Sequence, residues 1–213
     1  MPQLAAYSFD AAHGTASTVA DLSGNGRDFS IAGLPVARVA GRTAEGLRST
    51  GAGATPVLPA MGLTPHRSVA GWIRNDDPVA SWAIQHYVPS IDSGAWGILF
   101  LPPNIHIQAR STTTLARASA SWSTGVARHV VGTFDGSAVR LFLDGTLAGE
   151  SPLAGPLRTD TEPPALFVGM GALNGWMDDL RVFDEVLSQS DVVRYRDTPV
   201  QASSARSRML AMF

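Results

Sequence analysis

The chain has 213 residues, 45% of them hydrophobic, so it can bury a substantial core and is too apolar to be intrinsically disordered. Its 21 glycines and 14 prolines favour many turns between short strands over a helical fold. The formal net charge of −2 provides no basic footprint for nucleic acid, and the lack of cysteine excludes disulfides, thiolate metal sites and a cysteine nucleophile.

Apolar and polar residues alternate repeatedly along the chain, between turn residues such as Gly, Pro, Asn and Asp. A period of two is typical of strands, because successive side chains of a strand point to opposite faces. Gly41–Pro65 is rich in Gly, Ala, Thr and Pro and is expected to form a weak strand and a long loop, and Pro102–Asn104 is expected to form a turn. The pattern predicts strands over Leu4–Phe9, Phe29–Ile31, Ser68–Arg74, Ser81–Tyr87, Trp96–Leu101, Ile105–Arg110, His129–Phe134, Ala138–Leu143, Ala165–Val168 and Trp176–Phe183.

The strongest local signal is a hairpin in the segment V-R-L-F-L-D-G-T-L-A-G, which begins at Val139. Asp144 and Gly145 supply the two positive φ angles that a tight primed turn requires. Alternation places Val139, Leu141 and Leu143 on one face of the first strand.

One helix is predicted, in the segment S-Q-S-D-V-V-R-Y that begins at Ser188. Ser188 or Ser190 is a suitable N-cap, and Asp191 lies early in the helix, where the helix dipole favours an anion. Pro199 ends the helix, so we expect one domain over residues 1–198 and a C-terminal tail over residues 199–213. The tail is flexible or docks through its apolar end, Met209–Phe213.

Several motifs follow one another in a specific order. Y-S-F-D at Tyr7–Asp10 and D-L-S-G-N-G-R-D at Asp21–Asp28 precede V-A-G-W-I-R at Val69–Arg74. R-H-V-V-G-T-F-D-G-S-A-V-R-L-F-L-D-G-T-L-A-G at Arg128–Gly149 and N-G-W-M-D-D-L-R-V-F-D-E-V-L-S at Asn174–Ser188 come after it. Together they resemble the laminin-G-like jelly-roll domains of the concanavalin-A-like lectin/glucanase superfamily. The resemblance covers nearly the whole chain and implies an all-β jelly-roll sandwich of two antiparallel sheets with one short C-terminal helix.

Asp178 is the most informative polar residue. Alternation along its strand places Trp176, Asp178, Leu180 and Val182 on one face. A carboxylate between apolar neighbours on a buried face must be paired, hydrogen-bonded or bound to a metal ion.

Many members of the family hold a structural calcium ion near the N- and C-terminal strands, and oxygen ligands suit that ion. The resemblance implies Asp10, Asp21, Asn25 and Asp178 as its ligands here. Ala11 follows Asp10 where many relatives have glutamate, which removes one ligand. The alternative hypothesis is that Asp21 caps its own Ser-Gly-Asn-Gly turn and Asp178 accepts backbone amides. The sequence leaves both hypotheses open.

Motifs that would carry catalysis are missing, so we expect no enzyme. Glycoside hydrolysis requires two carboxylates at a defined separation, which glucanases of this fold usually present as Glu-x-Asp-x-x-Glu on one strand. Here the glutamates are isolated, and the carboxylates of Asp76–Asp77 and of Asp178–Asp179 point apart on an extended chain. The sequence also lacks a G-x-S-x-G elbow, a phosphate-binding loop and an H-E-x-x-H helix.

Ligand binding is predicted from aromatic side chains, because sugars are usually held by exposed rings and polar hydrogen bonds. Trp82, Tyr87 and Trp96 are the candidate ligand-binding rings. Core packing is the alternative for each of them, since tryptophan is mostly buried. Trp122 is a weaker candidate, because relatives often have a core-edge tryptophan there.

Two functions remain as hypotheses. The leading one is a non-catalytic lectin-like module that binds glycan or a cell-surface polymer, within a larger extracellular particle. The alternative is a structural phage virion protein, of the tail or the capsid, whose C-terminal tail contacts protein partners or a second copy. Both hypotheses imply an extracellular or virion-associated protein, although no segment has the pattern of a signal peptide. No segment has the length of a membrane span, and the net charge disfavours nucleic acid, so we expect neither membrane nor nucleic acid as a partner.

Overall fold

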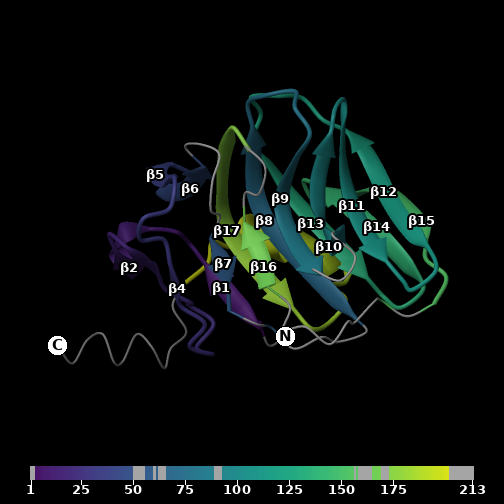
Figure 1. The fold of residues 1–213 in the computed structure, drawn as a ribbon, viewed down its shortest axis with the longest axis horizontal. Helices are drawn as coiled ribbons and strands as arrows, with labels where there is room; N and C mark the ends of the chain where they lie inside the picture. Colours follow the sequence, from purple (N-terminus) through teal and green to yellow (C-terminus); the bar gives the residue numbers. More distant parts are fainter. Residues whose placement is uncertain are drawn as a thin grey trace.

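The computed structural model describes residues 3–49, 56–59, 61, 66–88, 93–155, 157, 165–168 and 173–201, without the side chains of residues 87, 88, 93–95 and 165–168. Within these ranges two large antiparallel sheets lie face to face, with a small third sheet beside them (Figure 1). The predicted jelly-roll sandwich is confirmed.

The first large sheet has eight strands in the order β15-β14-β13-β8-β17-β6-β5, with β1 also paired to β17. Its strands are β1 (Ala5–Tyr7), β5 (Val36–Ala40), β6 (Glu45–Ser49), β8 (Arg67–Asn75), β13 (Arg128–Phe134), β14 (Ala138–Leu143), β15 (Thr146–Pro152) and β17 (Gly175–Phe183).

The second large sheet has six strands in the order β12-β11-β10-β9-β16-β7. Its strands are β7 (Val57–Leu58), β9 (Ser81–Val88), β10 (Ser93–Leu101), β11 (Asn104–Arg110), β12 (Leu115–Ser121) and β16 (Ala165–Val168). The small sheet follows a one-turn helix, η1 (Ala11–His13), and contains β2 (Gly14–Thr15), β3 (Thr18–Val19) and β4 (Phe29–Ser30).

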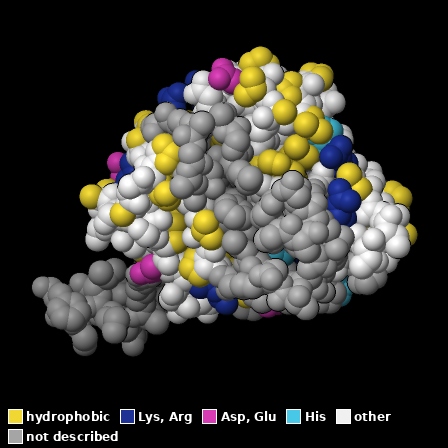
Figure 2. Space-filling model, in the orientation of Figure 1, with side chains coloured by type: hydrophobic (Ala, Val, Ile, Leu, Met, Phe, Trp, Pro, Cys, Tyr) yellow, Lys and Arg dark blue, Asp and Glu magenta, His cyan; other side chains and the backbone are white. Residues whose placement is uncertain are grey.

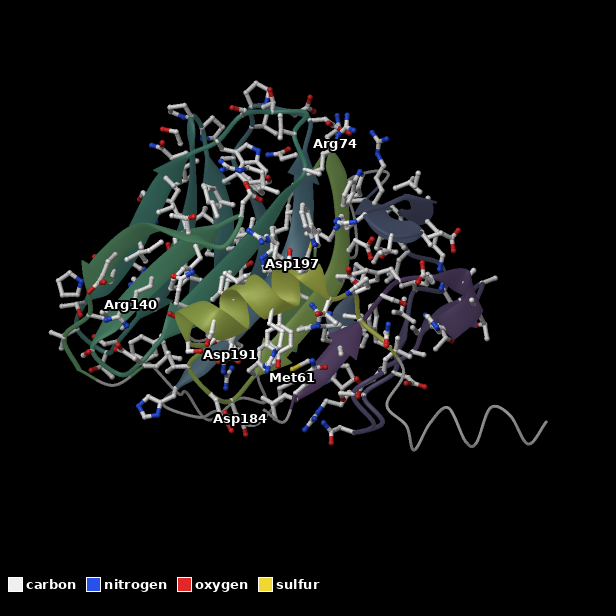
Figure 3. All side chains as sticks on the ribbon, turned by 180° about the vertical axis from the view of Figure 1, so that it is seen from behind. Met61, Arg74, Arg140, Asp184, Asp191 and Asp197 are labelled. Atoms are coloured by element: carbon white, nitrogen blue, oxygen red, sulfur yellow. The ribbon has the colours of Figure 1, made fainter. Side chains whose placement is uncertain are left out.

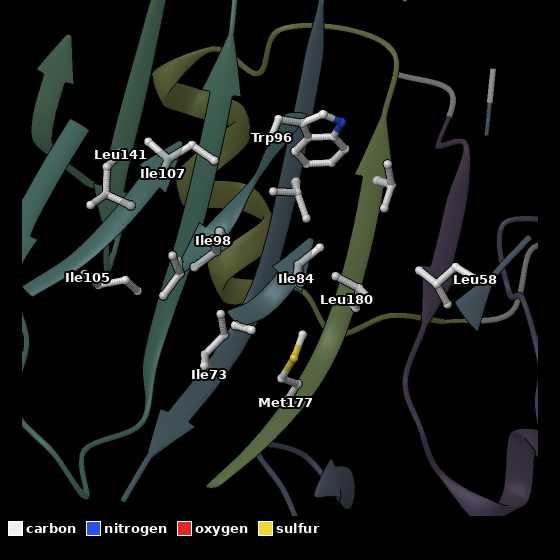
Figure 4. Packing of buried hydrophobic residues seen from close by; sticks show 14 of the residues in the cluster. Leu58, Ile73, Ile84, Trp96, Ile98, Ile105, Ile107, Leu141, Met177 and Leu180 are labelled. Atoms are coloured by element: carbon white, nitrogen blue, oxygen red, sulfur yellow. The ribbon is translucent and has the colours of Figure 1, made fainter. Parts of the chain in front are cut away.

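The main hydrophobic core fills the space between the two large sheets. Ile73 and Met177 of the first sheet meet Ile84 and Ile98 of the second, all within 1% of complete burial (Figure 4). Each such side chain contributes about 1.5–3 kcal/mol by leaving water, so this layer holds the two sheets together.

The predicted helix is α1 (Gln189–Asp197), and Ser188 is its N-cap. The Ser188 hydroxyl accepts the Asp191 amide at 3.2 Å, and the Asp191 carboxylate accepts the Ser188 amide at 3.1 Å, which forms a capping box. The helix crosses the outer face of the eight-stranded sheet, where Phe183 and Tyr195 form a second apolar cluster (Figure 3). No helix in the described part of the chain is long and apolar enough to cross a membrane.

The predicted hairpin is also confirmed. β14 and β15 pair across a turn in which Asp144 has a φ of 51° and Gly145 a φ of 90°. Val139, Leu141 and Leu143 all join the main core, as the alternation predicts.

Strand β17 departs from the predicted alternation. Asp179 has a φ of 51°, and the register with β8 shifts just after Asp178, which is a β-bulge. The extra residue reverses the faces of the strand, so Met177, Leu180 and Val182 share the main core. The prediction of one shared face is therefore wrong: Trp176 and Asp178 lie on the opposite face from Leu180 and Val182.

The first residues of the predicted tail pack on the domain. Val200 is 6% exposed and clusters with Ala6 and Leu22, and its amide donates to Asp179 Oδ1 at 2.8 Å. Residues 202–213, including the apolar end Met209–Phe213, lie outside the described residues.

Candidate binding pocket

Asp21, one of the predicted calcium ligands, is completely buried and caps its own turn. Its Oδ1 accepts the backbone amides of Ala6 and Ser23, both at 3.0 Å. Its Oδ2 accepts the Ser23 hydroxyl at 2.9 Å and the Arg27 amide at 3.1 Å. These bonds tie the 21–28 turn to β1.

Asp178 is also completely buried, and it holds the turn between β5 and β6. Its Oδ2 accepts the Arg42 amide at 2.7 Å and the Thr43 amide at 3.3 Å, and its Oδ1 accepts the Asp179 amide at 2.7 Å. Burial and, to a smaller degree, the charge of Asp179 raise the pKa of Asp178 to about 7.

The other two predicted ligands have similar roles. Asp10 Oδ1 accepts the Glu45 amide at 2.8 Å, and Asn25 presents its Nδ2, rather than an oxygen, to the carbonyls of Gln3 and Leu4 at 2.7 and 3.0 Å. Among the described residues no group of three or more His, Cys, Asp or Glu side chains is arranged to hold a metal ion. As arranged, the four residues do not fit a shared calcium site, and calcium binding stays a prediction.

The candidate rings lie in different surroundings. Trp96 is 5% exposed, packs in the main core and lies under the guanidinium of Arg67 at 5.1 Å, so the expected exposed ring is wrong there. Trp82 is half-buried and pairs with Leu99, so it lies on the outer face of the six-stranded sheet. The Tyr87 side chain is outside the described set.

A pocket of about 360 Å³ opens where the turns after β8, β10 and β12 meet, at the top of Figure 1. We call it the loop-end pocket. It is lined by Asn75, Asp77, Pro78, Phe100, Pro102, Pro103, Asn104, Trp122, Ser123 and Thr124.

One side of the loop-end pocket is aromatic and apolar. The rings of Phe100 and Trp122 meet edge to face with centroids 5.0 Å apart. The Trp122 amide donates to the Pro103 carbonyl at 2.9 Å, which attaches the end of β12 to the turn between β10 and β11. Hydrophobic side chains gather beside an acidic one at this end (Figure 2), where Val79 and Val126 are 45% and 48% exposed.

The other side of the pocket is polar. Asn75 is 1% exposed, and its Oδ1 accepts the Asp77 amide at 3.2 Å. The Asn174 amide group donates to Asp77 Oδ2 at 2.9 Å, which fixes the carboxylate and leaves Oδ1 as a further acceptor. Asn104 and Thr124 add polar groups to the lining.

Of the candidate rings, the weaker one, Trp122, lines this pocket, whereas Trp82 and Trp96 are not among its described lining residues. Its residues come from strand ends and from the turns between strands, where the sequence indicates connections rather than a site. A signal was present in the sequence: Pro78 and Pro102 each follow a predicted strand at the same end of the sandwich. Turns that follow alternate antiparallel strands lie at the same end of a sandwich. The distance between these turns depends on how the sheets pack, so the local sequence does not determine it.

The sandwich and its loop-end pocket define a lectin-like jelly-roll fold. The family model Laminin_G_3, described as the concanavalin A-like lectin/glucanases superfamily, matches residues 49–193. The chain belongs to this superfamily. No curated protein sequence matches it.

Solved structures show the same fold at low sequence identity. The binding domain of Paraclostridial Mosquitocidal Protein 1 has a TM-score of 0.74 and 14% identity, over 92% of this chain and 52% of that one. The botulinum neurotoxin serotype D binding domain has a TM-score of 0.72 and 13% identity, over 92% and 50%. A Trypanosoma rangeli sialidase has a TM-score of 0.63 and 14% identity, over 92% and 32%. The chain thus spans about half the length of the toxin binding domains it matches.

Proposed function

We propose that this protein is a non-catalytic carbohydrate-binding module whose ligand occupies the loop-end pocket. The observation that carries the proposal is the half-buried ring of Trp122, supported from behind by the buried Phe100, beside the polar side chains of Asp77 and Asn104. The apolar face of a sugar ring packs against aromatic side chains, and its hydroxyls bond to amides and carboxylates. The volume of about 360 Å³ lies within the usual range for small-ligand sites and suits one or two sugar units.

The carboxylates of the pocket favour binding over hydrolysis. Asp77 is the single carboxylate among the described lining residues, whereas glycoside hydrolysis uses a pair flanking the scissile bond. The adjacent Asp76 is engaged in an ion pair with Arg74, at 2.6 Å. Neither residue therefore has a partner carboxylate across the pocket in the described lining.

The setting of this activity is also a proposal. Two of the similar solved structures, from Paraclostridial Mosquitocidal Protein 1 and botulinum neurotoxin serotype D, are binding domains, which supports recognition of a cell-surface glycan or polymer outside the cell. The alternative, a structural virion protein, depends on contacts of the C-terminal tail beyond residue 201, outside the described residues. That alternative and the location in a virion stay predictions.

A glycan array followed by calorimetric titration of each hit tests the proposal. We expect Trp122→Ala and Asn104→Ala each to weaken binding at least about tenfold, a loss of about 1.4 kcal/mol or more. The first removes the aromatic ring of the pocket, and the second removes one of its polar groups. Trp82→Ala is the matched control, since it removes a half-buried tryptophan from the sheet face. Thermal melts of all three variants separate binding effects from unfolding.

Two results would overturn the proposal. One is the lack of binding to any glycan by a folded wild-type protein. The other is loss of binding in Trp82→Ala with normal binding in Asn104→Ala, which would move the site to the outer face of the six-stranded sheet.

A further inference from the structure

We infer that the loop-end pocket selects neutral glycans and discriminates against sialylated, uronic or sulfated ones. This inference rests on the proposed function, because it names the ligand class of the same pocket. It is carried by the charges of the lining residues and by the way the single charged group is held.

The described lining of the pocket carries one charge, and that charge is negative. Asp77 supplies it, and neither arginine nor lysine lines the pocket. The nearest cation along the chain, Arg74, is engaged with Asp76 through a 2.6 Å contact to Oδ1. Arg48 lies behind the lining, where its guanidinium donates to Asn174 Oδ1 and reaches Asp77 only through that amide. An acidic ligand therefore meets no cation among the described lining residues.

Asp77 is fixed in place and cannot simply turn away from a ligand. Its backbone amide donates to Asn75 Oδ1 at 3.2 Å, and its Oδ2 accepts Asn174 Nδ2 at 2.9 Å. Asn75 is itself buried at 1% exposure, so the support is part of the packed end of β8. The second carboxylate oxygen can accept hydroxyl groups of a sugar, which a neutral ligand supplies in number.

The same carboxylate opposes an acidic ligand in two ways. The Asp77 carboxylate and an anionic group of the ligand repel each other within the partly enclosed pocket. Contact also removes water from both anions, and no lining cation compensates for this desolvation. Deliberate exclusion of this kind is a common source of specificity. We therefore expect neutral glycans to bind at least about tenfold more tightly than acidic derivatives of the same chain.

The test measures affinity for matched pairs of glycans, each neutral oligosaccharide beside its sialylated and its sulfated form. Wild type is expected to prefer the neutral member by at least about tenfold. Asp77→Asn retains an acceptor for Asn174 but removes the charge, so it should reduce this preference to about threefold or less. Glu150→Gln, on β15, makes the same change in net charge away from the pocket and should leave the preference intact.

The outcomes separate the inference from the proposed function. Tight binding of acidic glycans that is lost in Trp122→Ala would overturn the neutral selectivity and leave the carbohydrate-binding role standing. A preference that Asp77→Asn and Glu150→Gln change equally would also overturn it, because overall charge would then be the cause. Failure of the folded protein to bind any member of any pair would overturn the proposed function itself.

Discussion

Replacing Asp21 with alanine is expected to destabilise the fold by about 3 kcal/mol. The Asp21 carboxylate is completely buried and accepts three backbone amides, from Ala6, Ser23 and Arg27. The Ala6 amide is on a residue only 1% exposed, so leaving it without an acceptor costs about 1–3 kcal/mol. Ser23 and Arg27 are half-buried, and water can replace part of what they lose, at about 0.5–1 kcal/mol each.

Denaturant unfolding measures this loss, and thermal melting should show a midpoint lower by about 6–12 °C for a chain of this length. The measurements are made in EDTA and again in calcium, because the capping role predicts the same loss in both. Asp197→Ala, on the exposed surface of α1, is the control and should leave the midpoint unchanged. A loss below about 1 kcal/mol would refute the capping role, and calcium stabilisation of wild type that Asp21→Ala abolishes would restore the metal site.

Three further predictions follow from the local geometry. Burial and, to a smaller degree, the charge of Asp179 raise the pKa of Asp178 to about 7, so Asp178 takes up its proton at a higher pH in the folded state than in the unfolded state. The free energy of unfolding of the wild type should therefore rise as the pH falls from about 8 toward 5. Denaturant titrations across this range should show a flatter slope for Asp178→Asn. Ser188→Ala removes the capping-box hydroxyl and should cost about 1 kcal/mol, and an unchanged melting midpoint would contradict that bond. Gly97→Ala should destabilise the fold more than Gly26→Ala, although both glycines have a positive φ. A Cβ added at Gly97 would lie 2.2 Å from a backbone carbonyl oxygen, whereas a Cβ added at Gly26 would have nothing within 4 Å. Equal denaturation midpoints would show that the strand at Gly97 shifts to make room.

The features predicted correctly from the sequence are those whose cause is local. The turn at Asp144-Gly145 needs two positive φ angles that only its own residues supply, and alternation of the flanking strand then sets its faces. The helix start at Ser188 has the same origin, because Ser188 and Asp191 satisfy each other's amides. Neither feature depends on a distant segment.

The errors arise where distant segments decide the outcome. The bulge in β17 forms because Asp179 tolerates a positive φ and because the strand must pair with β8. The residue pattern of β17 alone does not predict it. Trp96 could have been placed correctly, because Trp96, Ile98 and Phe100 alternate on one face and all three join the core. The loop-end pocket forms where the sandwich brings three turns together. The sequence indicates each of these turns but not that they lie side by side.

The buried aspartates of β17 have a structural role, because they hold distant segments of the chain to this strand. Asp178 and Asp179 accept amides from the 42–43 turn and from Val200, segments far from β17 in the sequence.

Strand β17 also lies beside the loop-end pocket. It begins at Gly175, where a Cβ would lie 1.8 Å from the Arg74 carbonyl oxygen, so only glycine permits this approach to β8. The close approach allows Asn174 Nδ2 to donate to Asp77 Oδ2 at 2.9 Å, which fixes the one charged group among the described lining residues. Gly175→Ala should therefore lower the affinity for the proposed glycan ligand as well as the stability of the fold. Asp178→Asn, which alters the support of the 42–43 turn, should affect stability before affinity. Titration of the two folded variants with one neutral glycan distinguishes these effects.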